Sequence, residues 1–298
     1  MKIGSLEIDS RYLIIAGVIL LLVVIFGVRQ HANRQAQEVA DGIISEVSDY
    51  VKVEYNSVRG EILGSAIVLN GVTVAPKSDP EQKSEIDRVQ IQARDFSDNG
   101  VPYTMNASIE GLAIYIDDMK PDDARTMRDL GYEEVMRGNL QFGYKYDLDE
   151  SHLSLHDIGI GIDDMGSISF DLDLGNITPD KRDLMNLLFT HQEILVGDFR
   201  LHYNDDSFIP RIIQYVADDT GMSEDEVLEM VIAKVEQDIR VADTNFARES
   251  LKNLKSFLEN QDSLSITARP EEPRPLGRLM QIQNTDDIIE YMNISIEN

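Results

Sequence analysis

The spacing of apolar residues divides the chain into an apolar N-terminal run, a long stretch of alternation, and a mostly helical last third. Residues 12–28 read YLIIAGVILLLVVIFGV, with no charge. At about 1.5 Å per residue, a helix of this length nearly crosses the roughly 30 Å hydrocarbon layer of a bilayer. Arg11 and Arg29 flank the run, where their side chains can reach the headgroups. The pattern predicts a transmembrane helix at 12–28.

A cleaved signal peptide is the competing interpretation of this run. The following sequence VRQHANRQAQEVADG lacks a small-x-small cleavage site, and cleavage after Ala36 would put Arg34 at the minus-three position. An uncleaved signal anchor is therefore favoured. Positive charges nearly balance on the two flanks, and long domains cross membranes largely regardless of charge. We expect residues 1–11 to form a cytoplasmic tail of a single-pass inner-membrane protein, with the main domain in the periplasm.

The next segment, residues 29–50, carries apolar residues at helical spacing. Val39, Ile43 and Val47 are four residues apart, which predicts an amphipathic helix or stalk. From Val51 the period changes to two, so residues 51–178 are predicted to form a β-rich domain.

Two glycines interrupt this alternation. Asn70-Gly71 predicts a tight turn or a bulge. Met105 and Ile109 share one face of a strand, but after Gly111 the apolar positions resume out of phase. An extra residue at Gly111, in a bulge that bends the strand, is the simplest explanation.

Three alternating segments at 140–146, 153–162 and 168–174 are separated by short polar turns. This spacing predicts an antiparallel meander. A short helix is expected to begin at Pro121 and to end near Gly131.

Residues 179–298 read as helix-rich and are expected to complete the same globule. Helices are predicted around 184–188, at 208–216 with an end near Gly221, after the capping box of Ser223 and Glu226, at 251–258, and at 286–292. Strands are predicted at 195–203, at 264–268 and in the final NISIE. The expected fold is α+β, an antiparallel sheet that could be curved, with the C-terminal helices packed on one face.

Composition narrows the choice of partners. The formal net charge is −27, so the average surface repels phosphate backbones, which argues against nucleic acid as a partner. The acidity fits a solvated surface, as in a saline habitat, or an acidic docking face. The absence of cysteine excludes disulfides, thiolate zinc sites and cysteine nucleophiles, and leaves the redox compartment undetermined.

Candidate metal sites are weak. Asp95, Ser97 and Asn99 match the start of a calcium loop, but its twelfth position is Asn106 rather than a bidentate Glu, which favours a polar turn. Residues 163–166 (DDMG) likewise predict a hairpin turn.

The histidines form no ligand cluster in the sequence. His152 and His156 lie in a predicted strand, where four residues span roughly 13 Å at about 3.3 Å per residue, too far to share one ion. His191 and His202 stand alone, so surface or hydrogen-bonding roles are favoured.

The chain has no nucleophile elbow, phosphate-binding loop, dinucleotide fingerprint or HExxH motif. Carboxylates are too numerous for one acid/base pair to be singled out. We therefore assign no catalytic, cofactor-binding or metal-binding residue, and the pattern argues against an enzyme.

Two stretches resemble uncharacterised single-pass envelope proteins of proteobacteria: residues 129–177, which begin DLGYEEVMRGNLQFGY, and residues 263–298, which begin SLSITARPEEPRP. The anchor, helix and segment VEYNSVRGEILGSAIVLNGVTVAP are also similar to the start of AsmA-like periplasmic proteins. That second resemblance implies a β domain associated with envelope lipids. It supplies no catalytic residues.

Taken together, the sequence predicts a membrane-anchored periplasmic binding protein of the cell envelope, with an envelope lipid or an inner-membrane protein as its ligand. The alternating apolar side chains of the β region could accept an acyl chain or could simply pack under helices. An accessory or scaffold subunit of a larger membrane complex is the alternative. A carboxylate-dependent hydrolase is a third class.

Overall fold

The computed structural model describes residues 41, 44, 48, 50–61, 66–77, 80, 83–97, 102–177 and 191–298. The predicted transmembrane helix at 12–28 and nearly all of the predicted stalk at 29–50 lie outside these residues. No helix within the described ranges combines the length and the apolar composition that a membrane crossing requires. The chain divides into two units, unit 1 (Met1–Gly143) and unit 2 (Tyr144–Asn298).

Unit 1 is built on an antiparallel sheet. Its strands β1 to β4 pair in chain order, and β5 follows β4. Its elements are β1 (Val51–Glu61), β2 (Ala66–Pro76), β3 (Ser84–Phe96), β4 (Pro102–Tyr115), the 3-10 helix η1 (Ile116–Asp118), α3 (Pro121–Asp129) and most of β5 (Val135–Asp147).

The alternation predicted from the sequence forms the core of unit 1. In β3 the side chains of Ile86, Val89, Ile91 and Ala93 are buried, whereas the other positions from 85 to 94 are partly or fully exposed. The helix predicted at Pro121 is confirmed as α3, with Pro121 in its first turn and Ala124 and Met127 buried.

Gly111 lies within β4 in the left-handed conformation, with φ of 69°. The irregularity displaces the backbone polar groups of Gly111 from regular pairing, and side chains of β5 bind them. The Gly111 N–H donates to Asn139 Oδ1 at 3.0 Å, and Arg137 Nη1 donates to the Gly111 carbonyl at 3.1 Å. The predicted irregularity at Gly111 is therefore confirmed, and β4 continues on both sides of it. Gly71 has φ of 58° and lies inside β2, so this dipeptide is not a turn between strands.

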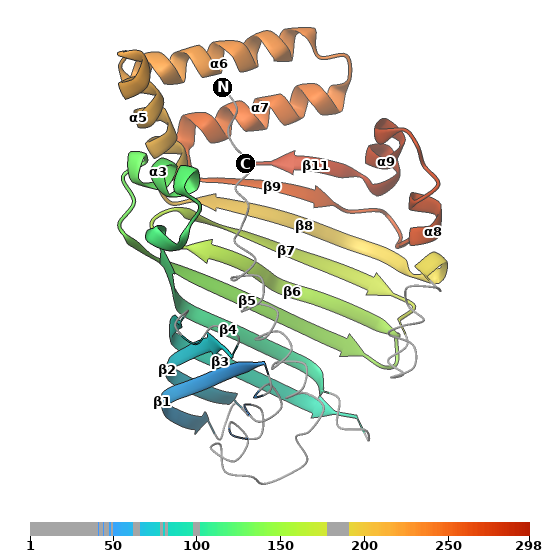
Figure 1. Cartoon of the computed structure of the whole chain (residues 1–298). Helices are drawn as coiled ribbons and strands as arrows, with labels where there is room; N and C mark the ends of the chain where they lie inside the picture. Colours follow the sequence, from blue (N-terminus) through green and yellow to red (C-terminus); the bar gives the residue numbers. More distant parts are fainter. Residues whose placement is uncertain are drawn as a thin grey trace. The chain divides into compact units, whose positions relative to one another are not determined.

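Unit 2 contains a second antiparallel arrangement of strands with three long helices (Figure 1). Its strands pair in the order β6-β7-β8-β9-β11, and β10 pairs with the start of β8. The elements are β6 (His152–Ile162), β7 (Gly166–Gly175), η2 (His191–Glu193), β8 (Leu195–Asp205), α5 (Phe208–Thr220), α6 (Glu224–Val241), α7 (Asn245–Asn260), β9 (Ser263–Ala268), β10 (Arg274–Pro275), α8 (Leu276–Leu279), α9 (Thr285–Met292) and β11 (Ile294–Glu297).

The predicted strands and helices of unit 2 are confirmed wherever the structure describes them. The turn at 163–166 joins β6 to β7, with Asp164 at φ of 61°. Gly221 ends α5 with φ of 71°, and Ser223 with Glu226 forms the predicted capping box of α6. The helix predicted around 184–188 lies outside the described residues. The predicted domain division at 178/179 falls in the same segment and stays a prediction.

Helix α7 packs on the sheet at β9 and β11. The rings of Phe257 and Tyr203 meet edge to face with centroids 5.9 Å apart, and Asn253 Nδ2 donates to the Ile296 carbonyl at 2.6 Å. Figure 1 shows α6 and α7 beside β11 and β9, with β6 and β7 on the far side of β8. The described chain is thus mostly antiparallel sheet with C-terminal helices, which confirms the α+β class.

The left-handed backbone at Gly111 predicts that Gly111→Ala lowers the free energy of unfolding by about 1–2 kcal/mol, because L-residues are strained there. The added Cβ would also overlap the Asp87 carboxylate. Urea unfolding of the full chain measures the loss. Asp87→Ala in the same background should recover only the part due to overlap. An unchanged midpoint for Gly111→Ala would contradict this account of β4.

The capping box predicts that Ser223→Ala destabilises α6 by about 1 kcal/mol, because the Glu226 N–H loses the hydroxyl that caps it. Thermal unfolding followed by circular dichroism measures the change.

The same box predicts a pH dependence. Hydrogen bonds from the backbone and side chain of Ser223 hold the pKa of Glu226 below its ordinary value. The folded state therefore binds this proton less readily than the unfolded state, so the stabilisation is present above the unfolded pKa and is lost as the pH falls through the folded pKa. Glu226→Gln should reduce the slope of stability against pH in the acid range. An identical slope in the variant would contradict the assignment.

Candidate binding surface on unit 2

Strand register gathers the apolar side chains of β6, β7 and β8 on one face of the unit 2 sheet. Residues paired directly across antiparallel strands point to the same side. Leu155 pairs with Leu172, and Leu172 pairs in turn with Phe199. We call the following set the apolar face: Leu153, Leu155, Ile158, Ile160, Ile168, Phe170, Leu172, Leu174, Val196, Phe199, Leu201 and Tyr203.

The opposite face of the same strands is polar. Ser169 pairs with His202, which pairs on its other side with Ser265, and Asp171 pairs with Arg200. We call this set the polar face: Ser154, Ser167, Ser169, Asp171, Asp173, Arg200, His202, Asn204, Ser265 and Thr267. The sheet therefore separates apolar from polar side chains over these pairs, and Leu195, which pairs with Gly175, is the exception on the polar face.

Two irregularities keep the faces uniform. The register of β6 shifts between Leu155 and Ile158, where Asp157 has φ of 53° and its N–H donates to Asp171 Oδ1 at 3.0 Å. Without the extra residue, the isoleucines that follow would turn to the polar face, because side chains alternate strictly along a strand. A second shift, in the pairing of β7 with β8, leaves Val196 opposite Leu174 on the apolar face.

The apolar face is open to solvent. Ile160 and Ile168 are 46% and 47% exposed, and no residue of β6 or β7 is fully buried. In unit 1, by contrast, Ile86 of β3 is 1% exposed. The contacts of α7 described above are with β9, with β11 and with Tyr203 of β8. Among the described residues, Ile160 and Ile168 therefore lack the cover that a sheet face of this composition normally has.

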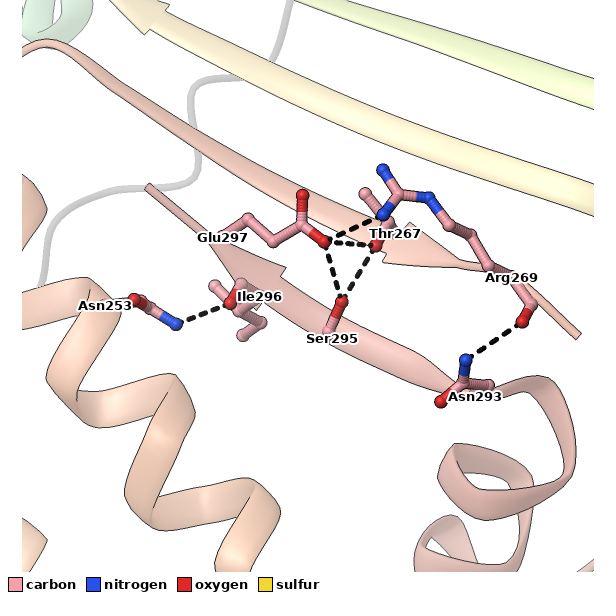
Figure 2. Close-up of polar contacts among 7 residues, drawn as sticks. All are labelled: Asn253, Thr267, Arg269, Asn293, Ser295, Ile296 and Glu297. Atoms are coloured by element: carbon pink, nitrogen blue, oxygen red, sulfur yellow. Dashed lines mark hydrogen bonds and ion pairs between the residues drawn. The ribbon is translucent and has the colours of Figure 1, made fainter.

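The polar face is internally hydrogen-bonded where β9 meets β11. Figure 2 shows one carboxylate oxygen of Glu297 at the centre of this network. It accepts hydrogen bonds from Thr267 at 3.2 Å, from Ser295 at 3.1 Å and from Arg269 at 3.2 Å. Thr267 is 1% exposed. Because these hydroxyls bond one another and the carboxylate, the network ties the last strand to the sheet and does not resemble an activated nucleophile.

His202 lies on the polar face, where its Nδ1 is 2.9 Å from Ser265 Oγ. Tyr144 of β5 belongs to the same unit, and burial raises the pKa of its hydroxyl to about 12, so it stays neutral at physiological pH. The side chains that make up the apolar face carry no carboxylate or amine, so they offer a ligand apolar contact without charge.

The histidines named from the sequence take the expected positions. His152 and His156 both lie in β6, as the strand prediction required. His152 Nε2 is 3.6 Å from Asp173, and His156 Nδ1 is 3.0 Å from the adjacent Asp157. His191 begins η2. The structure does not bring these histidines into a common cluster, and the described ranges contain no group of three or more metal-binding side chains.

The calcium-loop candidate is only partly described. Asp95 lies near the end of β3 with φ of 55°, and Asn106 pairs with Gln92 inside β4. Residues 98–101 are outside the described ranges.

Sequence reasoning identified the strands but not the openness of the apolar face. The alternation of apolar and polar residues in these strands was the feature of the sequence that could have indicated it. Strands covered on both faces carry continuous apolar runs, whereas Ser, Gly and Asp at every second position of β6 and β7 indicate that only one face needs cover.

Comparison with known proteins adds one match. A family model described as "Uncharacterized protein" matches residues 159–298, which include β7, β8 and the helices of unit 2. No curated protein matches the chain.

The exposure of the apolar face predicts that replacing isoleucine by alanine lowers the free energy of unfolding by different amounts at two positions of unit 2. Ile168→Ala should lower the free energy of unfolding by about 1 kcal/mol or less, since the side chain is already half in water. Ile213→Ala in α5, where the side chain is 8% exposed, should cost about 2–5 kcal/mol. Urea unfolding of both variants measures the difference. Equal costs would mean that Ile168 is covered.

Proposed function

We propose that this chain is a membrane-anchored periplasmic binding protein of the cell envelope, and that the apolar face of unit 2 binds the acyl chains of an envelope lipid. The exposure of Ile160 and Ile168, which pair across β6 and β7 near the hairpin turn at one end of the apolar face, is the observation that carries the proposal. The role is binding without catalysis.

The composition of the face favours hydrocarbon over a protein partner. Protein interfaces are enriched in the aromatic residues Tyr, Trp and Phe and in Met and Arg. The apolar face contains two Phe and one Tyr, but its other nine side chains are Leu, Ile or Val, so it offers mainly non-directional apolar contact.

The dimensions also suit an acyl chain. From Ile168 to Leu174 the apolar face follows β7 for roughly 20 Å at about 3.3 Å per residue. One leaflet of a bilayer holds acyl chains in roughly 15 Å of hydrocarbon, half of the 30 Å layer. A lipid tail can therefore lie along a strand for its whole length.

The predicted transmembrane helix at 12–28 supports the proposal, because an anchor would hold unit 2 beside the source of its ligand. The resemblance of the N-terminal segment to AsmA-like proteins points the same way. Residues 1–11 would then be cytoplasmic and the two units periplasmic.

A second candidate is an accessory or scaffold subunit of a membrane complex. It is favoured by α6, where Met230 and Val241 are 52% and 68% exposed on the helix surface. Exposed Met side chains are common at surfaces that adapt to protein partners.

Photo-crosslinking in cells tests the lipid proposal. The full chain carries benzoylphenylalanine at position 168 in place of Ile168, and the membranes are irradiated. We expect covalent lipid adducts, identified by mass spectrometry of the purified protein. The matched control places the same group at Ser169, the next residue of β7, which lies on the polar face and should give no lipid adduct.

The outcomes separate the two candidates. Lipid adducts at 168 and none at 169 support the proposed function. A stoichiometric protein adduct at 168 would replace it with the subunit hypothesis. Equal lipid labelling at both positions would mean that the crosslinker only reports proximity to the bilayer, and the proposal would fail.

A further inference from the structure

A lipid that moves from a bilayer to the apolar face exchanges one hydrocarbon environment for another. The acyl chains then contribute little to the free energy of binding, because the hydrophobic effect favours transfer out of water and the chains were already in hydrocarbon. A selective site needs a polar contact for the headgroup. One end of the apolar face carries basic side chains that could make such a contact.

The end row of the apolar face contains an arginine. Leu153 pairs with Leu174, Leu174 pairs with Val196, and Val196 pairs with Arg274 of β10. Directly paired residues share a face, so Arg274 extends the apolar row by one charged residue. Arginine has a long apolar stem that can lie along such a surface with the guanidinium at its edge.

Two neighbours complete a basic cluster at this end. The guanidinium carbon of Arg274 lies 4.8 Å from the ring centroid of Tyr291, and that of Arg278 lies 4.9 Å from the same centroid. Arg278 belongs to α8 and Tyr291 to α9, and Figure 1 shows both helices at the end where β8 begins. The Leu276 N–H donates to the Ile194 carbonyl at 2.8 Å, which fixes α8 to that end.

The cluster lacks the carboxylate partners found elsewhere in this acidic chain. Arg211 pairs with Asp164, and Arg269 pairs with Glu297. Among the described residues, neither Arg274 nor Arg278 forms an ion pair with a carboxylate, although the net charge is −27. Arg274 Nε is buried without a hydrogen-bond partner. Because both guanidinium carbons lie within 5 Å of one ring centroid, they are less than about 10 Å apart, and this pair of positive charges attracts an anion to that end of the face.

We propose that Arg274 and Arg278 bind the phosphate of a phospholipid headgroup, while the acyl chains of the same lipid lie on the apolar face. This inference rests on the proposed function. Guanidinium groups bind phosphate oxygens through paired, charge-assisted hydrogen bonds, and the ring of Tyr291 holds both arginines in a defined orientation. A phospholipid carries a phosphate and acyl chains in one molecule, so it can contact the arginines and the apolar face together.

The test uses the full chain with benzoylphenylalanine in place of Ile168, reconstituted in phosphatidylcholine vesicles. The vesicles contain equal small amounts of two radiolabelled tracers with the same acyl chains, dioleoylphosphatidylglycerol and dioleoylglycerol. We expect the phosphate-bearing tracer to give roughly tenfold more adduct than the diacylglycerol, as one or two charge-assisted hydrogen bonds would produce.

Variants assign the preference to the arginines. Arg278→Gln, at an exposed position, and Arg274→Gln should each bring the adduct ratio toward one without lowering the diacylglycerol adduct. Arg200→Gln, on the polar face of the same sheet, is the matched control and should leave the ratio unchanged. Unaltered thermal unfolding of each variant confirms that the fold is retained.

Failure of this inference differs from failure of the proposed function. A ratio near one in the wild type, or a ratio unaffected by both arginine variants, would overturn the headgroup site and leave acyl binding intact. Absence of adduct with either tracer would overturn the proposed function itself.

Discussion

Strand register is the constraint on which the functional surface of unit 2 depends. Side chains alternate along a strand, so a slip of one residue between β6 and β7 would move every aliphatic residue to the opposite side. The register shift between Leu155 and Ile158 corrects the phase of β6. The shift that leaves Leu174 opposite Val196 does the same for β8. Two local irregularities thus produce one uniform face.

The two units use the same alternation differently. In unit 1 the alternating residues form a closed interior, as the 1% exposure of both Ile86 and Met105 shows. In unit 2, α7 packs against β9 and β11, whereas Ile160 of β6 and Ile168 of β7 are nearly half exposed. A small domain gains stability by covering an aliphatic face. An aliphatic sheet face that stays exposed gives up this stability. Such exposed apolar surfaces are where binding sites are expected.

Polar and apolar chemistry are kept on opposite sides of the unit 2 sheet. The hydroxyls of Thr267 and Ser295 bond to Glu297, so the polar face stabilises the sheet edge. Arg274 is the exception, because its pairing with Val196 places a cation at the end of the apolar rows. This arrangement places an aliphatic surface beside a group that can bind an anion. It is complementary to a ligand that has both an apolar part and an anionic part.

The local elements of this protein can be predicted from residues that are neighbours in the chain. Pro121 begins α3, Gly221 ends α5, and Ser223 with Glu226 caps α6, because each depends on contacts within a few residues along the chain. Only the tertiary structure decided which aliphatic face is left open and which cation joins it. Arg274 meets Val196, and Tyr291 meets both arginines, through pairings between distant segments. Register and packing of such segments arise from the whole fold, and no local pattern of residues encodes them.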